Sequence, residues 1–218
     1  MIRDGFDKAG APDPAIWIPI GNPIVSGGAL YLKSSSDGVR GKTRFAMDAS
    51  ARVTVKVSSG SGDIFITPYE INERPDTYYP PIPYYRIRYV HLGYDYKVTV
   101  SDHEREYVSA WVPRALTAKV QCSGSKMVIT AVGADATGNP ITVNLAEIEN
   151  RFYNLDVALY LFGGATNIDY VEAGSGRELQ ALMMTEQIFP VIMTTVALVV
   201  IVLTLRHLIR GLRGIAIH

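Results

Sequence analysis

The sequence is poor in cysteine, with one among 218 residues, so no disulfide can form within the chain. Any fold must therefore rely on its hydrophobic core. Cys122 ends a stretch in which apolar Ala118 and Val120 alternate with polar side chains. Such alternation predicts a strand with Cys122 on its buried face, where a thiol acts as an inert apolar group.

Signatures of catalysis are also missing. The chain has no phosphate-binding loop, no dinucleotide fingerprint and no Gly-x-Ser-x-Gly elbow. Its histidines, which have no metal-ligand spacing, are His91, His103, His207 and His218. We therefore expect no enzyme, no catalytic residue, no bound cofactor and no metal centre built on histidine or cysteine.

Clusters of positive charge are absent from most of the chain. Residues 1–187 carry a net charge of −3, which argues against nucleic acid as the main ligand. Three arginines lie in the last 13 residues, at Arg206, Arg210 and Arg213. This short basic tail could contact anionic lipid headgroups, or nucleic acid only weakly.

One long hydrophobic run is present. Eighteen residues from 188 to 205 carry no charge, and the basic tail follows them directly. This length and flank predict a single transmembrane helix in contact with a lipid bilayer. We name as representative positions of the span Ile188, Phe189, Val196, Val200 and Leu205, and as tail anchors Arg206, Arg210 and Arg213. Ser175 and Glu178 fit a capping box that would start a helical lead-in.

The orientation of this predicted span is ambiguous. The basic tail favours the cytoplasmic side for the C-terminus and an external face, of a cell or virion membrane, for the rest of the chain. The first residues, however, contain no apolar signal-peptide core. A removed leader, insertion after synthesis, or assembly onto a membrane by partner proteins would each explain this conflict.

Short alternating or β-branched runs fill the region before residue 175. They predict ten strands, at 29–33, 51–57, 63–69, 84–90, 96–100, 106–112, 116–122, 126–132, 140–146 and 155–162. Glycine-containing connectors at 58–63 and 122–126 read as hairpin turns, and 133–140 as a longer loop. Many short strands at this spacing indicate a mostly β sandwich or barrel.

Tyrosine and proline concentrate in residues 72–96, which hold seven tyrosines and four prolines. Such a segment is either a contact surface or an ordinary packing seam. The candidate contact residues are Tyr78, Tyr79, Tyr84, Tyr85, Tyr94 and Tyr96. The tryptophans, Trp17 and Trp111, lie within apolar runs, and we expect both to be core residues.

Several strings occur in a suggestive order: DGFD at 4–7, AIWIPIG at 15–21, GGALYLK at 27–33 and LYLFGGATNIDYVEA at 159–173. In this order the chain resembles the concanavalin A-like, laminin-G-like jelly rolls over residues 4–173. The resemblance implies an antiparallel two-sheet sandwich, in a superfamily that includes lectins, glycan hydrolases and non-catalytic interaction modules. Fold alone does not choose among these functions.

The glycan hydrolases of this superfamily use a Glu-x-Asp-x-x-Glu pattern, because an acid and a nucleophile must flank one bond at about 5 Å. Here Asp169 and Glu172 match part of the pattern, but Asn167 stands where the first glutamate should be. Glu147 and Glu149 alternate correctly but lack the rest of the pattern. We expect all four carboxylates to be non-catalytic.

Calcium is the one ion that the sequence suggests. Asp135, Thr137 and Asn139 in one loop could offer oxygen ligands, although they lack the EF-hand series.

The organisation that follows has four segments: a jelly-roll domain at 1–174, a helical lead-in at 175–187, a span at 188–205 and a tail at 206–218. We expect a non-enzymatic, membrane-anchored structural subunit of an ordered assembly with other protein subunits, such as a membrane-containing virion, its capsid or a surface lattice. One alternative is a lectin-like receptor that binds glycans. Another is an accessory subunit of a membrane enzyme complex.

Overall fold

Antiparallel β-strands make up most of the computed structural model, which describes residues 1–71, 83–176, 178, 201 and 204. The chain divides into two compact units, Met1–Gly176 and Arg177–His218. All strands of the described residues lie in the first unit. They are β1 (Ile2–Asp4), β2 (Trp17–Ile20), β3 (Ile24–Ser26), β4 (Ala29–Leu32), β5 (Asp37–Gly41), β6 (Phe45–Ala46), β7 (Arg52–Thr67), β8 (Tyr85–Leu92), β9 (Asp95–Asp102), β10 (Glu106–Pro113), β11 (Leu116–Ser123), β12 (Lys126–Ala134), β13 (Pro140–Glu149) and β14 (Asp156–Gly174).

The predicted membrane segment falls largely outside this description. Of residues 188–205 only Ile201 and Thr204 are described, and none of the tail arginines is. Within the described part of the chain, no helix has the length and apolar character needed to cross a bilayer.

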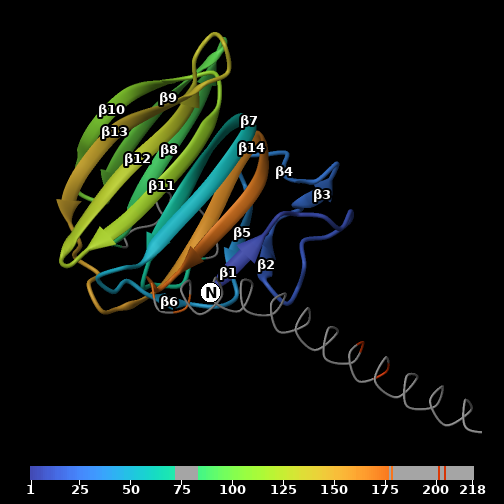
Figure 1. Ribbon diagram of the computed structural model, residues 1–218, viewed down its shortest axis with the longest axis horizontal. Helices are drawn as coiled ribbons and strands as arrows, with labels where there is room; N and C mark the ends of the chain where they lie inside the picture. Colours follow the sequence, from blue (N-terminus) through green and yellow to red (C-terminus); the bar gives the residue numbers. More distant parts are fainter. Residues whose placement is uncertain (72–82, 177, 179–200, 202–203, 205–218) are drawn as a thin grey trace, which may run out of the picture. The chain divides into compact units, whose positions relative to one another are not determined.

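Two long strands, β7 and β14, organise the domain. They pair with each other over nearly their whole length and lie side by side at its centre (Figure 1). The first half of β7 pairs with β11 and its second half with β8. Along its other edge, β14 pairs in turn with β6, β5, β4 and β1. Each long strand therefore takes part in both layers of a sandwich.

The bend between the layers lies at small residues. Gly60 has a φ of +84°, and the register between β7 and β14 shifts between Gly164 and Asn167. A side chain at Gly60 would collide with the backbone carbonyl of Ala165. The predicted hairpin turn at 58–63 is therefore wrong: the chain continues through it as one strand, because glycine permits a sharp bend as readily as a turn.

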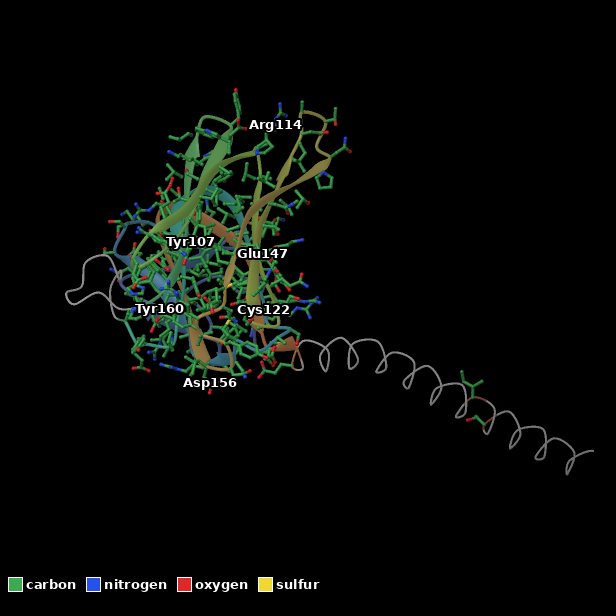
Figure 2. All side chains as sticks on the ribbon, turned by 90° about the vertical axis from the view of Figure 1, so that its left-hand side faces the viewer. Tyr107, Arg114, Cys122, Glu147, Asp156 and Tyr160 are labelled. Carbon is green, nitrogen blue, oxygen red and sulfur yellow. The ribbon has the colours of Figure 1, made fainter. Side chains whose placement is uncertain are left out.

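The remaining strands extend the two layers. Hydrogen-bonded neighbours follow the order β10-β9-β8-β7-β11-β12-β13, and β10 also lies close to β12 and β13. Figure 2 labels Tyr160 on β14 and Glu147 on β13, on opposite sides of the domain. The sequence-based expectation of a mostly β, antiparallel sandwich is confirmed.

Apolar side chains at every second position of the strands fill the space between the two layers. In β11, Leu116, Ala118, Val120 and Cys122 are buried, whereas Lys119 and Gln121 point to solvent. Cys122 is buried as predicted, and burial raises the pKa of its thiol to about 11. The sulfur therefore stays protonated and unreactive at neutral pH.

The two tryptophans have different environments. Trp17 is buried, stacks on Phe6 and donates from Nε1 to Asp4 Oδ2 at 2.7 Å. Trp111, predicted to be a core residue, is instead 56% exposed. In β10 the inward row is Val108, Ala110 and Val112, so the pleat directs Trp111 outward.

Candidate functional site

The sheet formed by β5, β14, β7, β8, β9 and β10 has a second side that points away from the main core, here called the outer face. One end of this face is covered. A separate apolar cluster lies there, made of Phe65, Ile71, Tyr84, Ala158, Tyr160 and Phe162. Ile71 donates its N–H to the Tyr160 hydroxyl at 2.9 Å, and Thr67 Oγ1 donates to the Pro83 carbonyl at 2.8 Å. These bonds hold the two described ends of the 68–84 connection against the sheet.

The other end of the outer face contains an open cavity of about 260 Å³. Its walls come from β7, β8, β14 and the loop before β5. The lining residues are Ser35, Ser61, Gly62, Asp63, Arg88, Tyr89, Val90 and Gly164. Hydroxyl, guanidinium and glycine backbone groups thus converge on one depression.

An ion-pair cluster forms the floor of this region. Asp63 is 1% exposed, and its Oδ1 accepts from Arg86 Nε at 2.8 Å and from Arg88 Nε at 3.0 Å. The Arg86 guanidinium also lies over the Phe65 ring, 5.4 Å from its centre. The Arg88 side chain remains 42% exposed. Asp63 therefore acts as an anchor that fixes the direction of Arg88 toward solvent.

Trp111 belongs to the same face. It pairs with Lys97 on β9, and Lys97 pairs with Val90 on β8, one of the residues that line the cavity. Paired residues on adjacent strands point to the same side and lie about 5 Å apart, so Trp111 stands roughly 10 Å from the cavity wall. The next row continues the polar surface, with Ser109 Oγ hydrogen-bonded to Thr99 Oγ1 at 3.1 Å.

We call this set the open face: Asp63, Arg88, Val90, Lys97, Thr99, Ser109 and Trp111. It presents an indole beside fixed polar groups and a shallow cavity. That combination suits a ligand with one flat apolar side and many hydroxyl groups at its edge. The sequence contained a usable signal, because alternation counted from Ser109 places Trp111 in the outward row.

The tyrosines predicted as a contact surface separate into three groups. Tyr84, Tyr85 and Tyr96 are buried, so the packing alternative describes them and the contact prediction is wrong for them. Tyr85 accepts from the Arg151 N–H and donates to the Glu149 carbonyl, and its burial raises its pKa to about 12. Tyr94 is 85% exposed in the β8–β9 turn. The other two, Tyr78 and Tyr79, lie outside the described residues.

The carboxylates considered for glycan hydrolysis do not line the cavity on the open face. Asp169 faces Lys56 at 3.5 Å, and Glu172 contacts the Tyr170 hydroxyl. The Asn167 amide donates to Ser59 Oγ at 2.8 Å. On the opposite sheet, Glu147 bonds Lys126 at 2.6 Å, and Glu149 is paired across the strands with the same lysine. Asp63 is the one carboxylate among the residues that line this cavity.

The loop considered for calcium bonds to itself. Asp135 Oδ1 accepts from the backbone N–H groups of Thr137 and Asn139, both at 2.8 Å, and from Thr137 Oγ1 at 2.7 Å. Hydrogen bonds from Thr137 and Asn139 lower the pKa of Asp135 to about 2. Across residues 1–71 and 83–176, no group of three or more acidic, histidine or cysteine side chains could hold a metal ion.

Comparison with known proteins identifies the fold. No protein-family model and no curated protein matches the sequence. Among solved structures, LamAcat from Zobellia galactanivorans has a TM-score of 0.50 at 16% identity, covering 80% of this chain and 97% of that one. The Ca²⁺-bound exoplasmic/lumenal domain of VIP36 has a TM-score of 0.54 at 10% identity, with 79% and 88% covered. Its metal-free form gives 0.54 at 10% identity, with 80% and 90% covered. The domain therefore has the concanavalin A-like jelly-roll fold, as the sequence resemblance implied.

Proposed function

We propose that the β domain is a glycan-binding module that performs no catalysis, and that the open face is its binding site. The observation that carries this proposal is the half-exposed Trp111 on the same face as the polar cavity beside Arg88. The Trp111 indole is a flat apolar platform beside fixed polar groups, and this arrangement suits a ligand with one apolar side and a polar rim.

The chemistry of a sugar ring matches this surface. One side of a pyranose is lined by C–H groups, which can stack on the indole of Trp111, and its rim carries hydroxyls. Arg88, Ser61 and Ser35 lie within the cavity and can hydrogen-bond such hydroxyls. Each net hydrogen bond contributes about 1 kcal/mol and aromatic contact about 1 kcal/mol, so one sugar unit binds weakly and several are needed.

The fold neighbours support a lectin-like function. The VIP36 domain has been crystallised in a form with Ca²⁺ and Man2, and that form has a TM-score of 0.53 with this chain at 10% identity. Among the residues of the open face, Asp63 is the carboxylate, and its buried Oδ1 is already bound by two arginines. We therefore propose binding that needs no metal ion, which chelation with EDTA would leave unchanged.

The absence of catalysis is part of the proposal. Hydrolysis with retention needs two carboxyl groups about 5 Å apart, one protonated and one ionised. Asp63, the carboxylate in the cavity, is buried and bound by two arginines, which suits an anchor rather than a nucleophile.

The test is a glycan array with the purified full-length chain, followed by titration of the best ligand against Trp111→Ala. We expect a loss of about fivefold in affinity, because removing the stacking platform costs about 1 kcal/mol. The control is Tyr153→Ala, which removes another half-exposed aromatic, between β13 and β14. Equal binding by both variants and the parent chain would place any glycan site elsewhere.

A further inference from the structure

We infer that the open face selects acidic saccharides, those whose sugar rings carry a carboxylate or sulfate. This inference rests on the proposed function and specifies its ligand class. The starting observation is that two cationic side chains lie on this face: Lys97 is the direct partner of Trp111 on β9, and Arg88 lies on β8 beside the cavity. The carboxylate of Asp95, two residues before Lys97 on β9, accepts from the Arg114 N–H at 3.2 Å.

The cations lie close enough to act on one ligand. Lys97 pairs with Val90, and Arg88 pairs with Thr99, so the two basic side chains are diagonal neighbours on β8 and β9. Side chains at diagonal positions on one face are separated by roughly 7–8 Å at their Cβ atoms. That spacing fits one sugar unit lying between them.

The carboxylate of the same cavity is withdrawn from solvent. Asp63 is 1% exposed and accepts from both Arg86 and Arg88, whereas the Arg88 side chain is 42% exposed and Lys97 is exposed. A ligand that enters the cavity therefore meets positive charge at the surface and negative charge only beneath it. A planar guanidinium with a fixed direction is well suited to a carboxylate or sulfate.

General attraction by the whole protein does not explain this arrangement. Residues 1–187 carry a net charge of −3, so a polyanion is repelled on average. A pair of cations beside an aromatic platform selects instead those ligands whose negative charge lies next to a ring that can stack on Trp111. Both the charge and the stacking surface are then required for binding.

The experiment compares two ligands that differ in charge alone: an oligogalacturonate and its carboxyl-reduced counterpart of equal length. Affinity of the full-length chain for each is measured by titration at low and at physiological salt. We expect the acidic ligand to bind at least tenfold more tightly at low salt, with this preference shrinking as salt rises.

Variants assign the preference to residues. Lys97→Gln and Arg88→Gln should each reduce the ratio of acidic-ligand affinity to neutral-ligand affinity by threefold or more, and Arg88→Gln should also weaken the neutral ligand by the hydrogen bonds that Arg88 gives to its hydroxyls. Lys119→Gln, an exposed lysine on β11 of the other sheet, is the matched control and should change neither affinity. Should Arg88→Gln unfold the domain, Lys97→Gln still decides the question, because Lys97 is exposed.

Three outcomes overturn the inference in different ways. Equal binding of both oligosaccharides, lost in Trp111→Ala, would reject acid selectivity and leave the glycan-binding proposal intact. If polyphosphate binds as tightly as oligogalacturonate, and Trp111→Ala leaves this binding unchanged, the open face recognises charge alone and the inference is rejected. No binding of these ligands, together with an empty glycan array, would reject both proposals.

Discussion

At the scale of single residues, burial separates the anchoring side chains of the open face from its exposed ones. Asp63 is the least exposed charged residue described there, and it fixes two arginines at once. Trp111 and Lys97 contribute little to the fold because their side chains project outward. Substitution should therefore affect stability at Asp63 and ligand affinity at Trp111 and Lys97.

Removing the charge of Asp63 should destabilise the domain strongly. In Asp63→Asn, two guanidinium groups lose their shared buried carboxylate, and such a loss costs about 3–5 kcal/mol. Urea denaturation followed by tryptophan fluorescence measures the free energy of unfolding. The control is Glu147→Gln, which removes a surface ion pair with Lys126 and should cost less than about 1 kcal/mol. A loss below about 1 kcal/mol in Asp63→Asn would contradict its role as an anchor.

The thiol of Cys122 should react only after unfolding. Because burial raises its pKa to about 11, labelling with a thiol reagent at pH 8 should be slow in the native chain and fast in urea. The unfolded thiol has a pKa of about 8.5, so its contribution to stability is complete below that pH. That contribution is lost as pH rises through about 9 to 11, since only the unfolded state ionises there. Rapid stoichiometric labelling in native conditions would refute the buried position.

At the scale of elements, the strands with clear alternation were predictable and the short or bent ones were not. The runs that became β8 to β13 contain eight to ten residues each with period-two patterns. In contrast, β1, β3, β5 and β6 have two to five residues, too few to show a period. The continuity of β7 was missed because SSGSG has the composition of a turn.

The same reasons explain which parts of the candidate site could be predicted from sequence. Ser109 and Trp111 alternate visibly with Val108 and Ala110, so the outward row of β10 was available from sequence. The ion pairs of Asp63 with Arg86 and Arg88 could not be predicted from sequence, because they depend on the pairing register between β7 and β8. The sequence of the connection between these strands carries no signal that fixes this register. Side chains that meet across such a connection require the structure.

The bend of β7 gives a prediction at this scale. Gly60→Ala should cost about 2 kcal/mol or more, because alanine is strained at φ +84° and its Cβ collides with the Ala165 carbonyl. The control is Gly93→Ala in the β8–β9 turn, where φ is +67° and no atom lies within 4 Å of the added carbon. That variant isolates the strain of positive φ, worth about 1 kcal/mol. Equal thermal shifts for the two variants would argue against close approach at the bend.

At the scale of the whole molecule, the membrane segment remains a prediction from sequence. We expect residues 188–205 to anchor the β domain to a membrane. This expectation rests on the uncharged run of 18 residues and the arginines that follow. Whether the protein belongs to a virion or to a surface lattice would then depend on the partner proteins in that membrane.

A truncation tests both the anchor and the independence of the domain. Ending the chain at Gly176, the last residue of the first unit, should move the protein from the membrane fraction to the supernatant after carbonate extraction. The truncated domain should still unfold cooperatively, because its described core lies within residues 1–176. A full-length chain that is itself released by carbonate would rule out a spanning helix.

The length of β14 has a mechanical consequence. This strand of 19 residues is hydrogen-bonded to β7 on one edge and to β6, β5, β4 and β1 in succession on the other. It also ends only two residues before Gly176, the last residue of the first unit. A pull exerted on that end would run along the strand, perpendicular to its ladder of hydrogen bonds, and would load many of them together. A domain tethered in this way would resist tension by shear rather than by unzipping one bond at a time.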